Sequence, residues 1–167
     1  SVYQEIFAQT KAKLRALMQI PESHEVLFLQ GGASLQFSMI PLNLMGEDGL
    51  ADYAVTGNFA NAAATEAEKY GRVHIAASSA DKNHSYIPAQ NELHLSKDAK
   101  YFYYCANNTI FGTEWHYVPE TDCPLVCDMS SNILSGPVDV SRYGVLYAGA
   151  QKNMAPAGLT VVVIDRA

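Results

Sequence analysis

Short apolar runs recur along the chain, and each is stopped by glycine, proline or polar residues. Runs of four to six residues that are rich in β-branched and aromatic side chains predict buried β-strands. The predicted strands are residues 25–30, 52–56, 73–77, 101–105, 125–128, 145–148 and 159–164. The pattern therefore predicts a sheet whose strands are covered on both faces.

Apolar residues at helical spacing predict helices between several of these strands. A capping box, Ser1-Val-Tyr-Gln4, opens the first helix, and Pro21 ends it. Its apolar positions are Val2, Tyr3, Ile6, Phe7, Leu14, Leu17 and Met18. Further helices are predicted over residues 34–45 and over the alanine-rich residues 59–70. Residues 78–98 are polar and rich in turn-forming residues, and they show no readable period.

Strands that alternate with helices predict right-handed crossovers and a mostly parallel, doubly wound α/β sheet with helices on both faces. One connection breaks the rule. Only a short link, which ends in Met154-Ala-Pro-Ala-Gly158, separates the strand around Val145 from the strand around Val162. Such a link is too short for a crossover, so we expect one antiparallel strand in the sheet.

Composition is typical of one globular domain of 167 residues, with 49% hydrophobic and 17% charged residues. The net charge is −6 and no basic stripe is present, so we expect no nucleic-acid partner. No stretch approaches the roughly 20 apolar residues of a membrane span, so we expect no membrane partner either.

Three cysteines, Cys105, Cys123 and Cys127, make an odd number. An odd number in a chain of ordinary size argues against a disulfide framework and for a reducing compartment such as the cytoplasm. Cys123 and Cys127 could be metal ligands, but no second pair accompanies them. We interpret them as buried side chains and predict no metal site.

Unusual polar groups follow the carboxyl ends of the predicted strands, where ligands bind in sheets of this kind. These groups are Gly31-Gly32-Ala33-Ser34, Asn107-Asn108-Thr109, Asp128 and Gln151-Lys152. Because parallel strands all end at one edge, we expect these groups to lie together. The glycine turn matches no nucleotide-binding motif.

Lys152 follows an apolar strand and has no acidic residue nearby in the sequence. A lysine in that place is most often a surface residue, but a buried one would be a candidate nucleophile for an aldehyde. Asp128 could keep a pyridine nitrogen protonated, although it could equally be a turn cap. The glycine turn offers N–H groups to a phosphate, and Phe59 could cover a flat ring, although alone it reads as core. Together these residues fit a pyridoxal phosphate site.

Four stretches carry a resemblance to a known family. They are FLQGGASLQFSMIPLNL, ADYAVTGNFANAAATEA, YYCANNTIFGTEW and LVCDMSSNILSGPVDVSRYGVLYAGAQKNMAPAGLTVVVI. They resemble the phosphoserine aminotransferases, which are class V, fold-type I pyridoxal phosphate enzymes. The resemblance extends from Glu25 to Ile164.

The resemblance implies a role for each matching residue. Lys152 matches the Schiff-base lysine, and Asp128 matches the carboxylate that faces the pyridine nitrogen. The other cofactor-binding positions are Ala33 and Ser34 in the phosphate turn, Thr109 and Gln151 around the cofactor, and Phe59 against its ring. The family commonly has tryptophan where this chain has Phe59. Some bacterial members also carry an arginine in the glycine-rich turn, where this chain has Gly-Gly-Ala-Ser.

The family reaction moves the amino group of glutamate to 3-phosphohydroxypyruvate, giving phosphoserine and 2-oxoglutarate for serine biosynthesis. Members of the family are homodimers and considerably longer than this chain. The resemblance therefore implies that residues 1–167 are the pyridoxal phosphate-binding core of the large domain. An N-terminal segment and the C-terminal small domain would be absent, and we expect little activity from this piece alone.

Two alternatives stay open. One is another class V enzyme, such as a cysteine desulfurase or an alanine–glyoxylate aminotransferase. A desulfurase needs a reactive cysteine on a loop, whereas the three cysteines here lie in or beside predicted strands. The other alternative is a cofactor-binding or structural domain without catalysis, in which Lys152 is merely a solvated surface residue.

Overall fold

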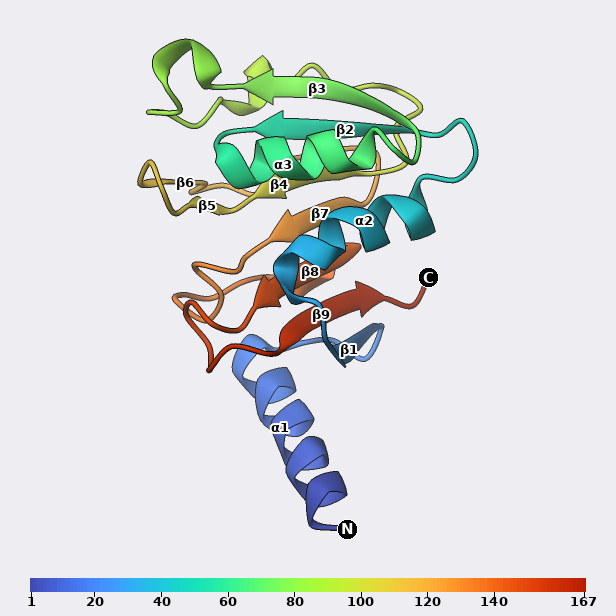
Figure 1. Ribbon diagram of the computed structural model, residues 1–167, viewed down its shortest axis with the longest axis vertical. Coiled ribbons are helices and arrows are strands. Elements are labelled where there is room, and N and C mark those ends of the chain that lie inside the picture. Colours follow the sequence, from blue (N-terminus) through green and yellow to red (C-terminus); the bar gives the residue numbers. More distant parts are fainter.

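A seven-stranded sheet runs through the centre of the computed structural model, which describes all of residues 1–167 (Figure 1). The helices are α1 (Val2–Met18), α2 (Gly32–Leu44) and α3 (Asn58–Ala67). The strands of the sheet are β1 (His24–Leu29), β2 (Leu50–Val55), β3 (Arg72–Ser78), β4 (Phe102–Cys105), β7 (Leu125–Asp128), β8 (Val145–Gly149) and β9 (Thr160–Asp165). A small hairpin joins β5 (Asn107–Asn108) to β6 (Thr113–Glu114). Single 3₁₀ turns occur at Ala80–Lys82, Gln90–Glu92 and Val140–Arg142. All seven strands predicted from the sequence are present.

The strand order is β1-β9-β8-β7-β4-β2-β3. Neighbours from β8 through β7, β4 and β2 to β3 pair in parallel. β9 is antiparallel to both of its neighbours, β8 and β1. This strand order confirms the mostly parallel α/β fold. It also confirms the one reversed strand that the short link ending at Gly158 had indicated.

Side chains alternate between the two faces of the sheet, and each face has its own core. In β4, Phe102 and Tyr104 belong to one core, whereas Tyr103 and Cys105 belong to the other. The face of Tyr103 is covered by α2 and α3, and α3 packs through four buried alanines (Figure 1). The face of Phe102 is covered by irregular segments and by the end of α1, which contributes Leu14.

Helix α1 has the predicted capping box, and it ends at Gln19 in a left-handed conformation. It projects from the body of the molecule (Figure 1). Leu14 and Met18 are its only buried residues, while Tyr3 is 75% exposed and Leu17 is 71% exposed. The helical period was therefore right, but most of the apolar stripe faces outward. No helix of the chain is both long and apolar enough to cross a bilayer.

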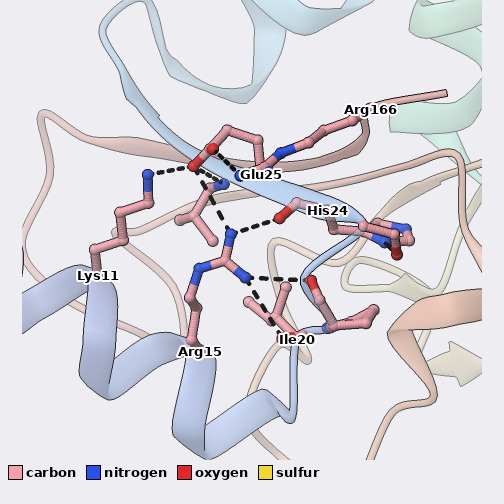
Figure 2. A network of polar contacts seen from close by, with 9 residues as sticks. Lys11, Arg15, Ile20, His24, Glu25 and Arg166 are labelled. Carbon is pink, nitrogen blue, oxygen red and sulfur yellow. Dashed lines mark hydrogen bonds and ion pairs between the residues drawn. The ribbon is translucent and has the colours of Figure 1, made fainter.

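Glu25 at the start of β1 is the centre of a cluster of charges that joins α1 to the sheet and to the C-terminal residues (Figure 2). Its carboxylate pairs with Lys11, with Arg166 at 2.7 Å and more distantly with Arg15 at 3.8 Å. Arg15 also donates to the carbonyl of His24. The hydrogen bonds from Lys11, Arg166 and the backbone N–H of Val26 lower the pKa of Glu25 to about 2.

Replacing Glu25 with glutamine is expected to destabilise the chain at neutral pH. The folded pKa lies below the ordinary value of 4.5, so the stabilisation is complete above that value and declines as the pH falls towards about 2. Urea unfolding of both proteins from pH 7 to pH 2.5 measures the difference, which should shrink with acid. Glu22→Gln changes an exposed carboxylate nearby and should leave stability unchanged at every pH.

Candidate active site

The carboxyl ends of the parallel strands meet at one edge of the sheet, as the sequence predicted. The glycine turn follows β1, Asp128 ends β7, and Lys152 follows β8. Phe59 lies in the first turn of α3, after β2, and Thr109 lies in the turn of the β5–β6 hairpin after β4. Segments that are far apart in the sequence thus bring the predicted residues to this edge.

Lys152 is held by two of the predicted residues. Its Nζ donates a hydrogen bond to Thr109 Oγ1 at 3.1 Å. The same nitrogen lies 4.5 Å from the centroid of the Phe59 ring, an attractive cation–π geometry. Lys152 is exposed, so the idea that burial would make its amine a nucleophile is wrong. Neighbouring side chains, not burial, fix its position.

Asp128 is the buried charge of the site. Only 4% of it is exposed, and its Oδ1 accepts hydrogen bonds from the Ser130 N–H at 2.8 Å and the Ser130 hydroxyl at 2.6 Å. Burial raises the pKa of Asp128, while the hydrogen bonds from Ser130, the nearby Tyr147 hydroxyl and the charge of Lys152 oppose that rise. Asp128 is therefore both a turn cap and a carboxylate in the candidate site.

The start of α2 forms the third part of the site. Gly31 is its N-cap with φ +95°, a conformation that favours glycine, and no side chain caps the helix. The first N–H groups of a helix have no partner within the helix, so those around Ala33 and Ser34 can bind an anion. A Cβ on Gly149 would lie only 3.0 Å from Gln151 Oε1 and 3.4 Å from Ala33 Cβ. The glycine thus lets the Gln151 amide approach the helix start.

Two supporting residues were assigned no role from the sequence, although Asn108 was among the polar groups expected at this edge. The Ser130 hydroxyl, besides donating to Asp128, accepts the N–H of Gly149 at 2.9 Å and so joins the ends of β7 and β8. The spacing Asp-x-Ser, typical of a side-chain-capped turn, was the available signal. Asn108 fills the space beside Gly57 and donates to the carbonyl of Thr56 at 2.6 Å.

No group of three or more His, Cys, Asp or Glu side chains is arranged to hold a metal ion. All three cysteines are free. Cys105 lies at the same edge as Asp128, and burial raises the pKa of its thiol. A neutral, buried thiol is a poor nucleophile, so Cys105 does not provide the reactive cysteine that a desulfurase requires.

Comparisons with known proteins agree on one family. The model of the aminotransferase class-V family matches residues 2–167. The phosphoserine aminotransferase of Pseudomonas paraeruginosa is 54% identical over 163 residues, which cover 97% of this chain and 45% of that protein. The chain thus spans less than half the length of the curated relatives it matches.

Solved structures give the same result. A phosphoserine aminotransferase from Bacillus circulans subsp. alkalophilus superposes with a TM-score of 0.96 at 43% identity, covering 99% of this chain and 46% of that one. A phosphoserine aminotransferase from Trichomonas vaginalis, solved with PLP bound, gives a TM-score of 0.92 at 40% identity, covering 99% of this chain and 47% of that one.

Proposed function

The chain belongs to the aminotransferase class-V family, and on that premise we propose that it is the cofactor-binding core of a pyridoxal phosphate-dependent phosphoserine aminotransferase. The whole enzyme would transfer the amino group of glutamate to 3-phosphohydroxypyruvate. One observation carries the proposal. Lys152 contacts Thr109 and Phe59 at the edge of the sheet where Asp128 ends β7.

The residues at this edge fit pyridoxal phosphate. The uncapped start of α2 and the Gln151 amide beside Gly149 offer donors to a phosphate group. Phe59 is 38% exposed, which leaves ring surface for a flat aromatic ligand. Lys152 presents a primary amine, and Asp128 a buried carboxylate, so each chemical part of the cofactor has a matching group.

When bound, pyridoxal phosphate supplies an aldehyde for an amine and a ring that withdraws electrons from the attached substrate carbon. Thr109 and Phe59 hold the Lys152 amine in one place. In its neutral form, Lys152 Nζ can accept a proton from a bound amino acid and return it. Ionised Asp128 favours a protonated ring nitrogen, and the two hydrogen bonds from Ser130 fix the direction of its carboxylate.

The proposal extends to organisation and setting. Residues 1–167 would be the large-domain core of a longer chain, and the outward apolar stripe of α1 supports contact with further protein. We propose a homodimer in the cytoplasm that acts on small molecules, with neither nucleic acid nor membrane as partner. The three free cysteines and the net charge of −6 support that setting.

Trapping the cofactor tests the proposed site directly. After incubation with pyridoxal phosphate and reduction with borohydride, intact mass and peptide mapping should show one phosphopyridoxyl group, on Lys152. The Thr109 and Phe59 contacts favour this lysine over the others. Unfolding the chain in urea before the incubation is the control, and it should spread the label over many lysines.

Label on Lys11, Lys69 and Lys97 of the folded chain, without preference for Lys152, would contradict the proposed site and favour a domain without catalysis. Pyridoxal lacking the phosphate should label Lys152 less efficiently, because the start of α2 then has no anion to bind. Equal labelling by pyridoxal and pyridoxal phosphate would show that Ala33, Ser34 and Gln151 do not bind the phosphate.

A further inference from the structure

Asp128 has two neighbours on the sheet that the proposed mechanism leaves without a role. β7 lies between β4 and β8, and Asp128 is the register partner of Cys105 on one side and Tyr147 on the other. Cys105 and Tyr147 both belong to the core under α2 and α3, as does Val126, two residues before Asp128. Because side chains alternate along a strand, Asp128 points to this same face.

Cys105 and Tyr147 differ in the acceptors to which they can donate a hydrogen bond. The Cys105 thiol donates to the carbonyl of Asn107, with 3.4 Å between sulfur and oxygen. It is therefore engaged away from the carboxylate. Tyr147 has no such backbone acceptor, and its hydroxyl oxygen lies 2.8 Å from that of Tyr103. Tyr147 is fully buried and Tyr103 is 1% exposed, so water cannot easily replace either partner.

A phenol has one proton, which fixes the direction of this chain of hydroxyl groups. An ionised carboxylate only accepts hydrogen bonds, so a hydroxyl beside it is a donor. If Tyr147 gives its proton to Asp128, Tyr103 must be the donor between the two tyrosines. We propose that Tyr147 is a positioning residue for Asp128, with its hydroxyl donating to the carboxylate while it accepts a hydrogen bond from Tyr103.

A hydrogen bond from Tyr147 would hold and stabilise the Asp128 carboxylate. Ser130 occupies Oδ1 of Asp128, so a donor on the sheet side gives the carboxylate a second support. Burial raises the pKa of Asp128, and the proposed hydrogen bond from the Tyr147 hydroxyl acts in the opposite direction. The tyrosine pair thus helps a buried carboxyl to stay ionised, which is the form that its proposed role requires.

The other titratable groups around Asp128 are few. They are Cys105, Cys127, Tyr103 and Lys152, beside Tyr147 itself. α2 has no charged residue, and the one charged residue of α3, Glu66, is engaged with Ser38 and Lys69. The inference rests on the proposed function only for what Asp128 faces, because the Ser130–Asp128 and Tyr103–Tyr147 hydrogen bonds are present in this chain without any cofactor.

The test is a carboxyl ¹³C NMR titration of Asp128 in the 167-residue chain without cofactor. Tyr147→Phe should lower the acid dissociation constant of Asp128 about tenfold, because one hydrogen bond to the charged form is lost. Tyr53→Phe is the matched control. Tyr53 forms a buried tyrosine pair with Tyr101 at 2.7 Å in the same core, but it is no register partner of Asp128. It should leave the Asp128 titration unchanged.

The double variant Tyr103→Phe with Tyr147→Phe removes both hydroxyl groups and leaves no unpaired one buried. It should reproduce the titration of Tyr147→Phe, which keeps the test valid where the single variant unfolds. An unchanged Asp128 titration in either variant would overturn the proposal, as would an equal shift in Tyr53→Phe. Because no cofactor is present, a failure here is distinct from a failure of pyridoxal phosphate to bind.

Discussion

Replacing Lys152 with arginine is expected to abolish the borohydride-trapped adduct with pyridoxal phosphate. In the whole enzyme the substitution should lower transamination by about 10²–10⁴-fold, the usual contribution of a general acid–base group. Arginine keeps the positive charge over Phe59 and can still donate to Thr109. It lacks an amine that can attack an aldehyde and does not give up its proton at neutral pH. Intact mass and a coupled assay with glutamate measure the two effects.

Lys82→Arg is a matched control for that substitution, because Lys82 also lies over an aromatic ring, 5.2 Å from the centroid of Tyr86. It should change neither labelling nor activity. Lys152 is exposed, so its replacement should alter the free energy of unfolding by less than about 0.5 kcal/mol. Wild-type labelling or turnover in Lys152→Arg would show that another lysine performs the chemistry.

Replacing Asp128 with asparagine is the second substitution with a large expected effect. Asparagine keeps the size of the side chain and an oxygen for Ser130, but it loses the negative charge. We expect activity of the whole enzyme to fall about 10²–10³-fold, the range found when a preorganised electrostatic partner is removed. With pyridoxal phosphate bound, the absorbance spectrum of the variant should also lose the contribution of the form whose ring nitrogen is protonated.

Stability should change in the opposite direction. The pKa of Asp128 is raised above its ordinary value of 3.8 in the folded chain, so its ionised form costs folding free energy at neutral pH. That cost is absent below about pH 3.8, where the carboxyl is protonated in both states. Asp128→Asn is therefore expected to be more stable than wild type at pH 7, with a difference that shrinks in acid.

The chain contains a matched control for Asp128 as well. Asp139 makes the same turn, accepting the Ser141 N–H at 3.1 Å and the Ser141 hydroxyl at 2.6 Å, but it is exposed to solvent. Asp139→Asn should leave both activity and stability nearly unchanged. Equal effects of the two substitutions would mean that the turn, and not the buried charge, is what matters at Asp128.

Much of the architecture could be predicted because it depends on local patterns. The apolar runs predicted the strands, and the short link that ends at Gly158 predicted the reversed strand β9. The predicted residues at the strand ends follow from topology, since parallel strands finish at one edge. Lys152 and Thr109 meet there although 43 residues separate them in the sequence.

Exposure and register could not be predicted in the same way. The apolar stripe of α1 has a clear helical period, but nothing in that period tells which surface covers Tyr3 or Leu17. Lys152 is exposed for a similar reason, because its burial depends on segments other than its own. Tyr147 lies beside Asp128 only through the pairing of β7 with β8, a relation between strands that neither strand encodes alone.

The place of β9 between β1 and β8 has a consequence for how the chain folds. β1 pairs only with β9, so Val26 finds its partner Val163 only after all the residues between them have been made. Strands β2, β3, β4, β7 and β8 can pair during synthesis, whereas β1 must wait through a long loop closure. Meanwhile its apolar residues are open to wrong partners. On the ribosome, β9 completes the sheet, and the glycine turn after β1 comes to lie beside the end of β8 in the same late event.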